Sequence, residues 1–297
     1  FSGRVHETVE YFLMVAGAQS GHAPFQIEHF GYGLLREASE IKYLRNLELL
    51  HKELAEDPRN ANARYHLGLT LMALEREAEA RLAFEEALAG DCATPVLKAM
   101  ILNMKSYHHL RAAELQPALQ AASLSVEIVP AQNTGRLLKG LSLFYMSRFA
   151  EAAPLLLESY RFLSLPPGEW QSDISFEDSI DKIDLIEKIG ICLSECGQVA
   201  EALPFLKLTA RAKPGPEVFE RLGINFLSSG QYTEAVDYLQ KAKAGLDEQN
   251  ALALPLSFAF FRRGDFEQAA ASFCSAEPRS PQEVSVALQI IEAMAAE

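Results

Sequence analysis

The sequence predicts an all-α protein, a right-handed solenoid of about six helix–turn–helix repeats. Three observations predict this fold class. A small residue recurs at a nearly constant interval, a pattern of small and large residues follows each recurrence, and glycine and proline stand at regular places between these patterns. The three observations mark the first helix, the second helix and the turns of each repeat.

The first helix of each predicted repeat carries a glycine or serine where it crosses its neighbour. Two helix backbones approach closely only over a small side chain, so this position indicates the crossing point. Successive markers are 38, 34, 50, 33 and 34 residues apart. The markers are Gly68, Ser106, Gly140, Gly190, Gly223 and Ser257.

The second helix of each repeat carries two small residues on either side of a central residue that is usually large. Their spacing places all three on one helix face, where the central residue fills the groove of the neighbouring helix. The sets are Ala80, Phe84 and Ala87; Ala118, Ala122 and Ser125; Ala152, Leu156 and Ser159; Ala202, Leu206 and Thr209; Ala235, Leu239 and Ala242; Ala269, Phe273 and Ala276.

Glycine and proline mark the turns and the ends of the predicted helices. Glycine is favoured in the turn between two helices because it adopts backbone conformations that strain other residues, and proline cannot continue a helix. The turn glycines are Gly197, Gly230 and Gly264, and the prolines that end second helices are Pro58, Pro130, Pro214 and Pro281.

With these features the chain resembles the tetratricopeptide repeat family over residues 59–281, as six tandem units with an insertion near residues 164–181. The second unit matches least well, because Ser106 and Tyr107 replace the expected glycine neighbourhood. Residues 33–58 are expected to cap the stack at the N-terminal end. Residues 282–297 are expected to form the C-terminal capping helix.

The resemblance implies that the first helices line a concave groove that binds a protein or peptide. The predicted lining is aromatic at both ends and acidic in the middle, which favours a basic or hydroxyl-rich peptide; an acidic stripe that is simply solvated is the alternative. Its glutamates argue against the Lys and Asn clamp by which some family members grip carboxylates. The predicted lining residues are Tyr65, Leu69, Met72, Asn103, Tyr107, Arg111, Phe144, Tyr145, Glu187, Glu195, Glu217, Glu220, Phe258, Phe261 and Arg262.

The insertion contains the only tryptophan of the chain. Trp170 and Phe176 either fold back onto the solenoid from a surface loop or anchor a ligand, since insertions in repeat proteins gather on the binding face.

Composition limits the partners and the compartment. The 297 residues carry a formal charge of −13, which argues against nucleic-acid and anionic-membrane partners. Four scattered cysteines suit a reducing, cytoplasmic location. Cys192 and Cys196 share a helix face, but with no second ligand pair nearby we expect no metal site there. The chain contains no apolar run long enough to span a membrane.

The first residues do not follow the repeat. Residues 1–32 alternate apolar and polar side chains, which favours short strands, as at the end of an upstream α/β domain. Arg4-Val5-His6-Glu7, Ile27-Glu28-His29-Phe30-Gly31-Tyr32 and Lys42-Tyr43-Leu44-Arg45-Asn46-Leu47 occur in order. Over residues 3–68 the chain resembles the C-terminal end of bacterial family 2 glycosyltransferases fused to tetratricopeptide repeats.

This second resemblance implies a parent enzyme that uses a divalent metal and a nucleotide-sugar donor. The chain has no Asp-x-Asp triplet, and it begins with Phe1, so the catalytic half is expected to be missing and this chain alone is expected to be inactive and without a cofactor. His6, Glu7, His29 and Tyr32 match family positions on the active-site side. The alternative is that His6 and His29 only form hydrogen bonds between two domains.

Two functions follow. The chain is expected to be an interaction scaffold, the acceptor- or partner-binding module of a glycosyltransferase. The alternative is a stand-alone adaptor or self-association module without a link to sugar transfer.

Overall fold

The computed structural model describes residues 36–89, 94–165, 181–246 and 252–276. Within these ranges it contains thirteen helices and no strand. The helices are α2 (Arg36–Glu56), α3 (Ala61–Ala73), α4 (Glu77–Ala89), α5 (Pro95–Arg111), α6 (Leu115–Ile128), α7 (Asn133–Tyr145), α8 (Phe149–Phe162), α9 (Lys182–Glu195), α10 (Val199–Ala212), α11 (Pro216–Ser228), α12 (Tyr232–Gly245), α13 (Ala253–Arg263) and α14 (Phe266–Cys274).

Several sequence expectations lie outside the described residues. They are the segment 1–32 with His6, Glu7, His29 and Tyr32, the insertion residues Trp170 and Phe176, Pro281 and the predicted helix 282–297.

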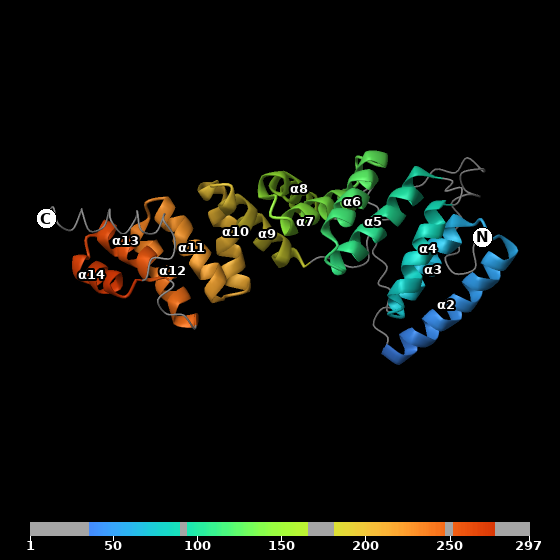
Figure 1. Cartoon of the computed structure of the whole chain (residues 1–297), viewed down its shortest axis with the longest axis horizontal. Coiled ribbons are helices and arrows are strands. Elements are labelled where there is room, and N and C mark those ends of the chain that lie inside the picture. Colours follow the sequence, from blue (N-terminus) through green and yellow to red (C-terminus); the bar gives the residue numbers. More distant parts are fainter. Residues whose placement is uncertain (1–35, 90–93, 166–180, 247–251, 277–297) are drawn as a thin grey trace. The chain divides into compact units, whose positions relative to one another are not determined.

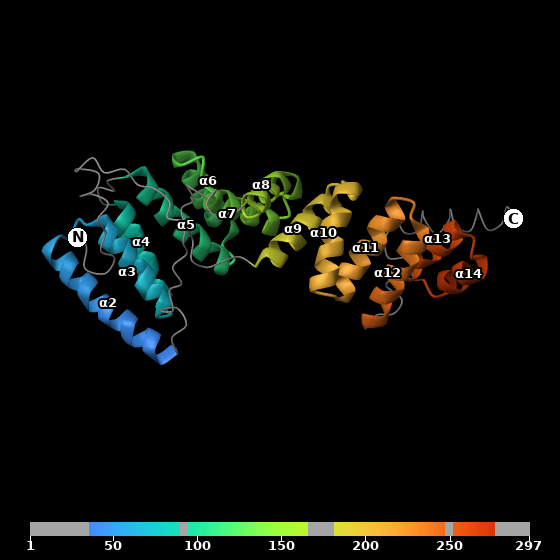
Figure 2. The same cartoon turned by 180° about the vertical axis from the view of Figure 1, so that it is seen from behind.

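The helices confirm the all-α prediction and its order of two helices per repeat. The chain divides into two compact units. Unit 1 contains α2 to α7, and unit 2 contains α8 up to Tyr160 together with α9 to α14. The successive helices α2 to α7 of unit 1 pack side by side, and so do the successive helices α9 to α14 of unit 2 (Figures 1 and 2).

The core of unit 1 shows why α2 packs on the first repeat. Leu50 of α2 is buried in one cluster with Phe84 of α4 and Ile101 of α5, and Leu47 and Leu54 pack against this cluster. Burying such side chains stabilises the fold by roughly 1.5–3 kcal/mol each. An isolated helix pair could not supply that cover, so each repeat depends on its neighbour.

Three of the four glycine markers, Gly68, Gly190 and Gly223, lie at close helix crossings, as predicted. A Cβ atom added at Gly68 would lie 2.4 Å from Cε1 of Phe84, and one added at Gly223 would lie 2.5 Å from Cγ of Leu239. At Gly190 the corresponding atom is Cδ2 of Leu206, at 2.9 Å. The central residue of the second helix therefore occupies the space that any larger residue at the marker would need.

The serine markers replace this steric fit by a hydrogen bond. The hydroxyl of Ser106 donates to the carbonyl oxygen of Ala118 over 2.9 Å, and that of Ser257 donates to the carbonyl oxygen of Ala269 over 2.8 Å. Both serines are fully buried. The bond ties the first helix to the second helix of the same repeat.

The turns partly depart from the glycine expectation. Gly197, Gly230 and Gly264 have φ of 72°, 75° and 90°, in the left-handed region that favours glycine. The equivalent turns of the first three repeats use Glu75, Ala113 and Ser147, with φ of 59°, 57° and 57°. The same backbone geometry therefore occurs where the sequence offers no glycine.

The proline expectation holds at the three described sites. Helices α2, α6 and α10 end two residues before Pro58, Pro130 and Pro214.

Candidate partner-binding surface

First helices of successive repeats adjoin inside unit 2. Arg221 of α11 donates to Glu195 of α9 over 2.6 Å, and the side-chain amide of Asn225 donates to the hydroxyl of Ser194 over 2.7 Å. The two bonds link α9 to α11 along one seam. This arrangement is what a surface made of first helices requires.

The predicted lining residues differ in exposure. Two are buried, namely Tyr65 and Asn103. The partly exposed ones are Leu69, Met72, Tyr107, Phe144, Glu187, Glu220, Phe258 and Phe261. The exposed ones are Arg111, Tyr145, Glu195, Glu217 and Arg262.

Asn103 belongs to a buried polar network rather than to an open surface. Its side chain is 1% exposed. Its amide nitrogen donates to Oε1 of Gln132 over 2.7 Å, and its amide oxygen accepts from the hydroxyl of Ser125 over 2.7 Å. The amide nitrogen of Gln132 also donates to the carbonyl oxygen of Ser125 over 2.8 Å. We therefore leave Asn103 out of the candidate surface, since its polar atoms are already engaged.

Within unit 1, the candidate residues are mainly aromatic and include one cation. The guanidinium of Arg111 lies 5.9 Å from the centre of the Tyr107 ring and forms an ion pair of 3.2 Å with Glu77 of α4. On α7, the rings of Phe144 and Tyr145 meet edge to face with centres 5.4 Å apart, and Tyr145 is 52% exposed. Exposed aromatic rings of this kind are frequent anchors in protein interfaces.

Within unit 2, the candidate residues on α13 are also aromatic and include one cation. Arg262 lies close to two rings, with its guanidinium 4.9 Å from the centre of the Tyr232 ring and 5.8 Å from the centre of the Phe258 ring. Phe261 meets Phe266 at 5.7 Å. The guanidinium is exposed while its position is defined by the rings, so it can face a partner without prior ordering.

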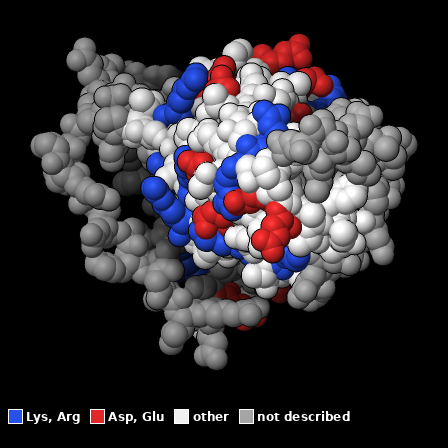
Figure 3. Space-filling view, turned by 90° about the vertical axis from the view of Figure 1, so that its left-hand side faces the viewer, with Lys and Arg blue, Asp and Glu red and all other residues white. Residues whose placement is uncertain are grey.

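The predicted acidic part of the surface, on α9 and α11, has cations beside some of its carboxylates. Glu195 is paired with Arg221, and Lys213 is bonded to Asp184. The hydrogen bond that Lys213 donates to Asp184, followed by the charges of Asp184, Asp181 and Glu187, raises the pKa of Lys213. On the face shown in Figure 3, Lys and Arg side chains lie among Asp and Glu. Glu217 and Glu220 remain as carboxylates without a cationic partner within the described residues.

Two buried titratable groups lie apart from this surface. Burial raises the pKa of the Cys192 thiol to about 12, with the nearby Cys196 as a smaller cause, so the thiol stays protonated and unreactive. Burial is also the main reason that the pKa of His108 is lowered, so this imidazole is neutral at pH 7.

Within the part of the chain that the structure describes, no group of three His, Cys, Asp or Glu side chains could hold a metal ion. The described helices also include none that is long and apolar enough to cross a bilayer.

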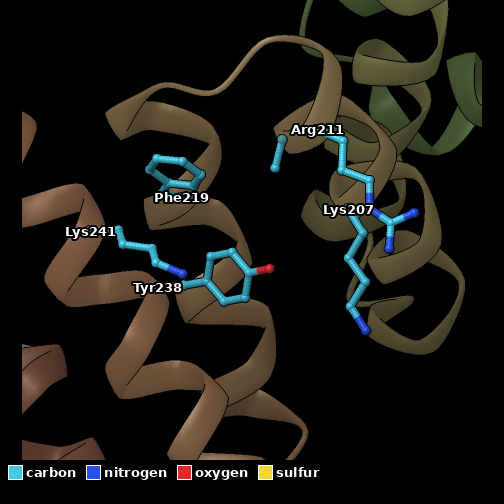
Figure 4. Close-up of a pocket in the computed structure, with 6 residues that line it drawn as sticks. Lys207, Arg211, Phe219, Tyr238 and Lys241 are labelled. Carbon is cyan, nitrogen blue, oxygen red and sulfur yellow. The ribbon is translucent and has the colours of Figure 1, made fainter.

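Sequence reasoning missed one feature, a basic and aromatic pocket between α10, α11 and α12 (Figure 4). The available signal was the spacing of Lys207 and Arg211, four residues apart on a predicted helix. Phe219 and Tyr238 gave no signal of their own, because aromatic residues in a helical repeat are ordinarily core residues.

Comparison with known proteins supports the repeat assignment. Residues 44–93 match a family model described as tetratricopeptide repeat. The solved structure of YrrB, described as a TPR protein with an unusual peptide-binding site, is similar with a TM-score of 0.51 and 15% identity over 76% of this chain and 98% of that chain. This likeness shows the fold, and the chain is a tetratricopeptide-type α-solenoid.

Two MamA structures are also similar. MamA residues 41 to the end from Desulfovibrio magneticus RS-1 match with a TM-score of 0.45 and 20% identity over 60% of this chain and 92% of that chain. MamA MSR-1 matches with a TM-score of 0.48 and 17% identity over 67% of this chain and 99% of that chain. No curated protein matches the sequence.

Proposed function

We propose that this chain is a protein-interaction scaffold that binds a peptide segment of its partner along the first helices of its repeats. The carrying observation is the seam between α9 and α11, where Arg221 meets Glu195 and Asn225 meets Ser194. It brings the first helices α9 and α11 together, and Glu187, Glu217 and Glu220 on these two helices reach solvent. The peptide-binding site named for YrrB agrees with this use of the fold.

The partner segment is proposed to be basic. Glu217 is exposed and Glu220 is partly exposed on α11, and neither is neutralised by a cation within the described residues. Glu187 adds a third carboxylate on α9. Acidic side chains at the surface attract a basic segment and raise its association rate more than its final affinity.

The proposal is tested by reversing two of these charges. The double variant Glu187→Lys, Glu220→Lys should weaken binding of a short fluorescein-labelled peptide of Lys and Ser by about tenfold, measured by fluorescence anisotropy at low salt. The melting temperature should stay nearly unchanged, because both side chains reach solvent.

A matched control carries the same charge change on second helices. Glu201 and Glu234 are exposed in the first turns of α10 and α12. The control Glu201→Lys, Glu234→Lys should retain most of the affinity. Equal loss in both variants would mean that net charge alone, and not the first-helix surface, attracts the peptide.

A second candidate function is that the scaffold serves as the acceptor-binding module of a family 2 glycosyltransferase. It rests on the resemblance of residues 3–68 alone, and neither the family match nor the similar structures add support for it. The test is to read the gene upstream of the codon for Phe1. An α/β domain with an Asp-x-Asp motif there would support the candidate, and an initiator Met directly before Phe1 would remove it.

We also propose that the interaction scaffold is located in the cytoplasm. Cys192, Cys196 and Cys274 are free thiols, which suits a reducing compartment.

A further inference from the structure

Unit 2 contains a pocket of basic and aromatic residues, although the chain as a whole is strongly acidic. The pocket has a volume of about 330 Å³ and lies between α10, α11 and α12 (Figure 4). This volume is at the lower end for ligand pockets, so it suits one or two side chains of a partner rather than a large cofactor. The lining residues are Lys207, Ala210, Arg211, Phe219, Tyr238 and Lys241.

Two of the cations have no neutralising neighbour. Lys207 and Arg211 lie four residues apart on α10, so they project from the same side of this helix. Both are exposed, and neither has an acidic partner within the described residues. An arginine and a lysine together offer a forked donor and a point charge to one anionic group.

Aromatic rings lie beside these cations, and one of the rings contacts Lys207. The Tyr238 ring stacks on Phe226 with centres 5.4 Å apart, and the Phe219 ring lies 6.1 Å from Tyr238. The ammonium of Lys207 lies 5.0 Å from the Phe226 ring. In Figure 4 the hydroxyl end of Tyr238 points toward the helix that carries Lys207 and Arg211. The rings thus provide an ordered apolar wall beside the charges, which lowers the entropic cost of binding.

The third cation is partly neutralised. Lys241 forms a 2.7 Å ion pair with Asp237 and lies 4.9 Å from the Tyr238 ring. With Asp237 counted, the pocket carries the net positive charge of Lys207 and Arg211 alone. This charge matches a carboxylate, and the carboxylate of Asp237 would repel a dianionic phosphate about twice as strongly as a single carboxylate at the same distance.

We propose that this pocket is a docking site for an acidic segment of a partner protein. A carboxylate of the segment binds Lys207 and Arg211, and an apolar side chain beside it packs against Phe219 and Tyr238. Two of the three helices are second helices, and the charge preference is opposite to that of the first-helix surface. The site therefore adds a second contact and does not depend on the first.

The experiment uses the full chain and a short fluorescein-labelled peptide of Glu, Leu and Gly, followed by fluorescence anisotropy. The double variant Lys207→Gln, Arg211→Gln should raise the Kd of this peptide by at least about tenfold, as expected for losing charge-assisted hydrogen bonds. A peptide with Gln in place of each Glu should bind the original chain at least about tenfold more weakly. Raising the salt concentration should weaken binding of the Glu peptide.

Two controls separate this site from other effects. The variant Lys52→Gln, Lys98→Gln removes two exposed cations from unit 1 and should leave the Kd unchanged. The variant Glu187→Lys, Glu220→Lys should also not weaken this binding, so the two proposals fail independently. If the double variant at the pocket melts at a lower temperature, Arg211→Gln alone is measured and should raise the Kd about threefold.

Three results would overturn the proposal. The first is an unchanged Kd in the pocket variants. The second is that the original chain binds a single-stranded oligothymidylate at least as tightly as the Glu peptide and that the pocket variants lose this binding. The third is concentration-dependent self-association in sedimentation experiments that the pocket variant abolishes, because the occupant would then be a second copy of this chain.

Discussion

The helix pair α5–α6 in unit 1 and the pair α11–α12 in unit 2 follow one plan but use different residues at its two critical points. At the crossing, α11–α12 has Gly223 against Leu239, whereas α5–α6 has Ser106 hydrogen-bonded to the carbonyl oxygen of Ala118. The first solution fills the space with an apolar side chain. The second leaves the central position to the small Ala122 and joins the helices by a polar bond.

The turns of the same two helix pairs have the same backbone geometry but place different residues in it. The amide of Glu114 donates to the carbonyl oxygen of His109 over 2.8 Å, and that of Gln231 donates to the carbonyl oxygen of Phe226 over 2.9 Å. The residue before each donor is left-handed, with φ of 57° at Ala113 and 75° at Gly230. One turn geometry is therefore built with and without glycine, and tertiary packing maintains it where the local residue disfavours it.

The largest effect on stability is expected from placing a large side chain at the glycine of the α11–α12 crossing. Gly223→Leu should lower the free energy of unfolding by roughly 1–3 kcal/mol, because an added Cβ already meets Cγ of Leu239 at 2.5 Å. Urea denaturation followed by circular dichroism measures the change. The control Ser228→Leu places leucine at an exposed position of the same helix and should have little effect. Unchanged stability of Gly223→Leu would show that the crossing lies elsewhere on α11.

An intermediate effect on stability is expected from converting the α5–α6 crossing, which has serine and alanine, into the glycine and leucine type of the α11–α12 crossing. Ala122→Leu alone should lower the free energy of unfolding by roughly 1–3 kcal/mol, because Ala122 is fully buried at the position equivalent to Leu239. Adding Ser106→Gly should recover about 1 kcal/mol relative to additivity, since it creates the combination present at Gly223 and Leu239.

A control double-mutant cycle combines Ser106→Gly with Leu124→Ala. Leu124 is 46% exposed. These two changes should add without coupling, since Leu124 reaches solvent. If the Ala122→Leu cycle is also additive, the two crossings are not interchangeable and the comparison fails at this point.

The smallest effect is expected in the turns. Ala113→Gly should raise the free energy of unfolding by about 1 kcal/mol, because glycine adopts the left-handed conformation without strain. Gly230→Ala should lower it by about the same amount. Ala112→Gly is the control, since Ala112 has φ of −82° and glycine there should not stabilise the chain. Equilibrium unfolding in urea compares the three variants, and a destabilised Ala113→Gly would contradict the strain at Ala113.

Sequence reasoning predicted the repeat pattern well because the pattern is itself a packing requirement. Small residues at Gly68, Gly190 and Gly223 are needed wherever helices cross closely, so their spacing reports the fold directly. The left-handed turn at Ala113 could not be predicted, because nothing in an alanine signals it. The candidate surface was predicted only in outline, since helical spacing shows which face a residue occupies but not its partners.

The sequence by itself determined the helices, their order and the small residues at their crossings, because each depends on neighbours a few residues apart or on the repeat interval. It did not determine every buried side chain, since Tyr65 and Asn103 were predicted to line the surface and are buried. Only the tertiary structure decided which charges remain free. Arg221 neutralises Glu195 from the next first helix, and the Asn103 amide turns inward to Gln132 and Ser125. Lys207, Phe219 and Tyr238 come from three helices and meet at one pocket. Such contacts join residues from different helices, and their geometry arises only when the helices pack.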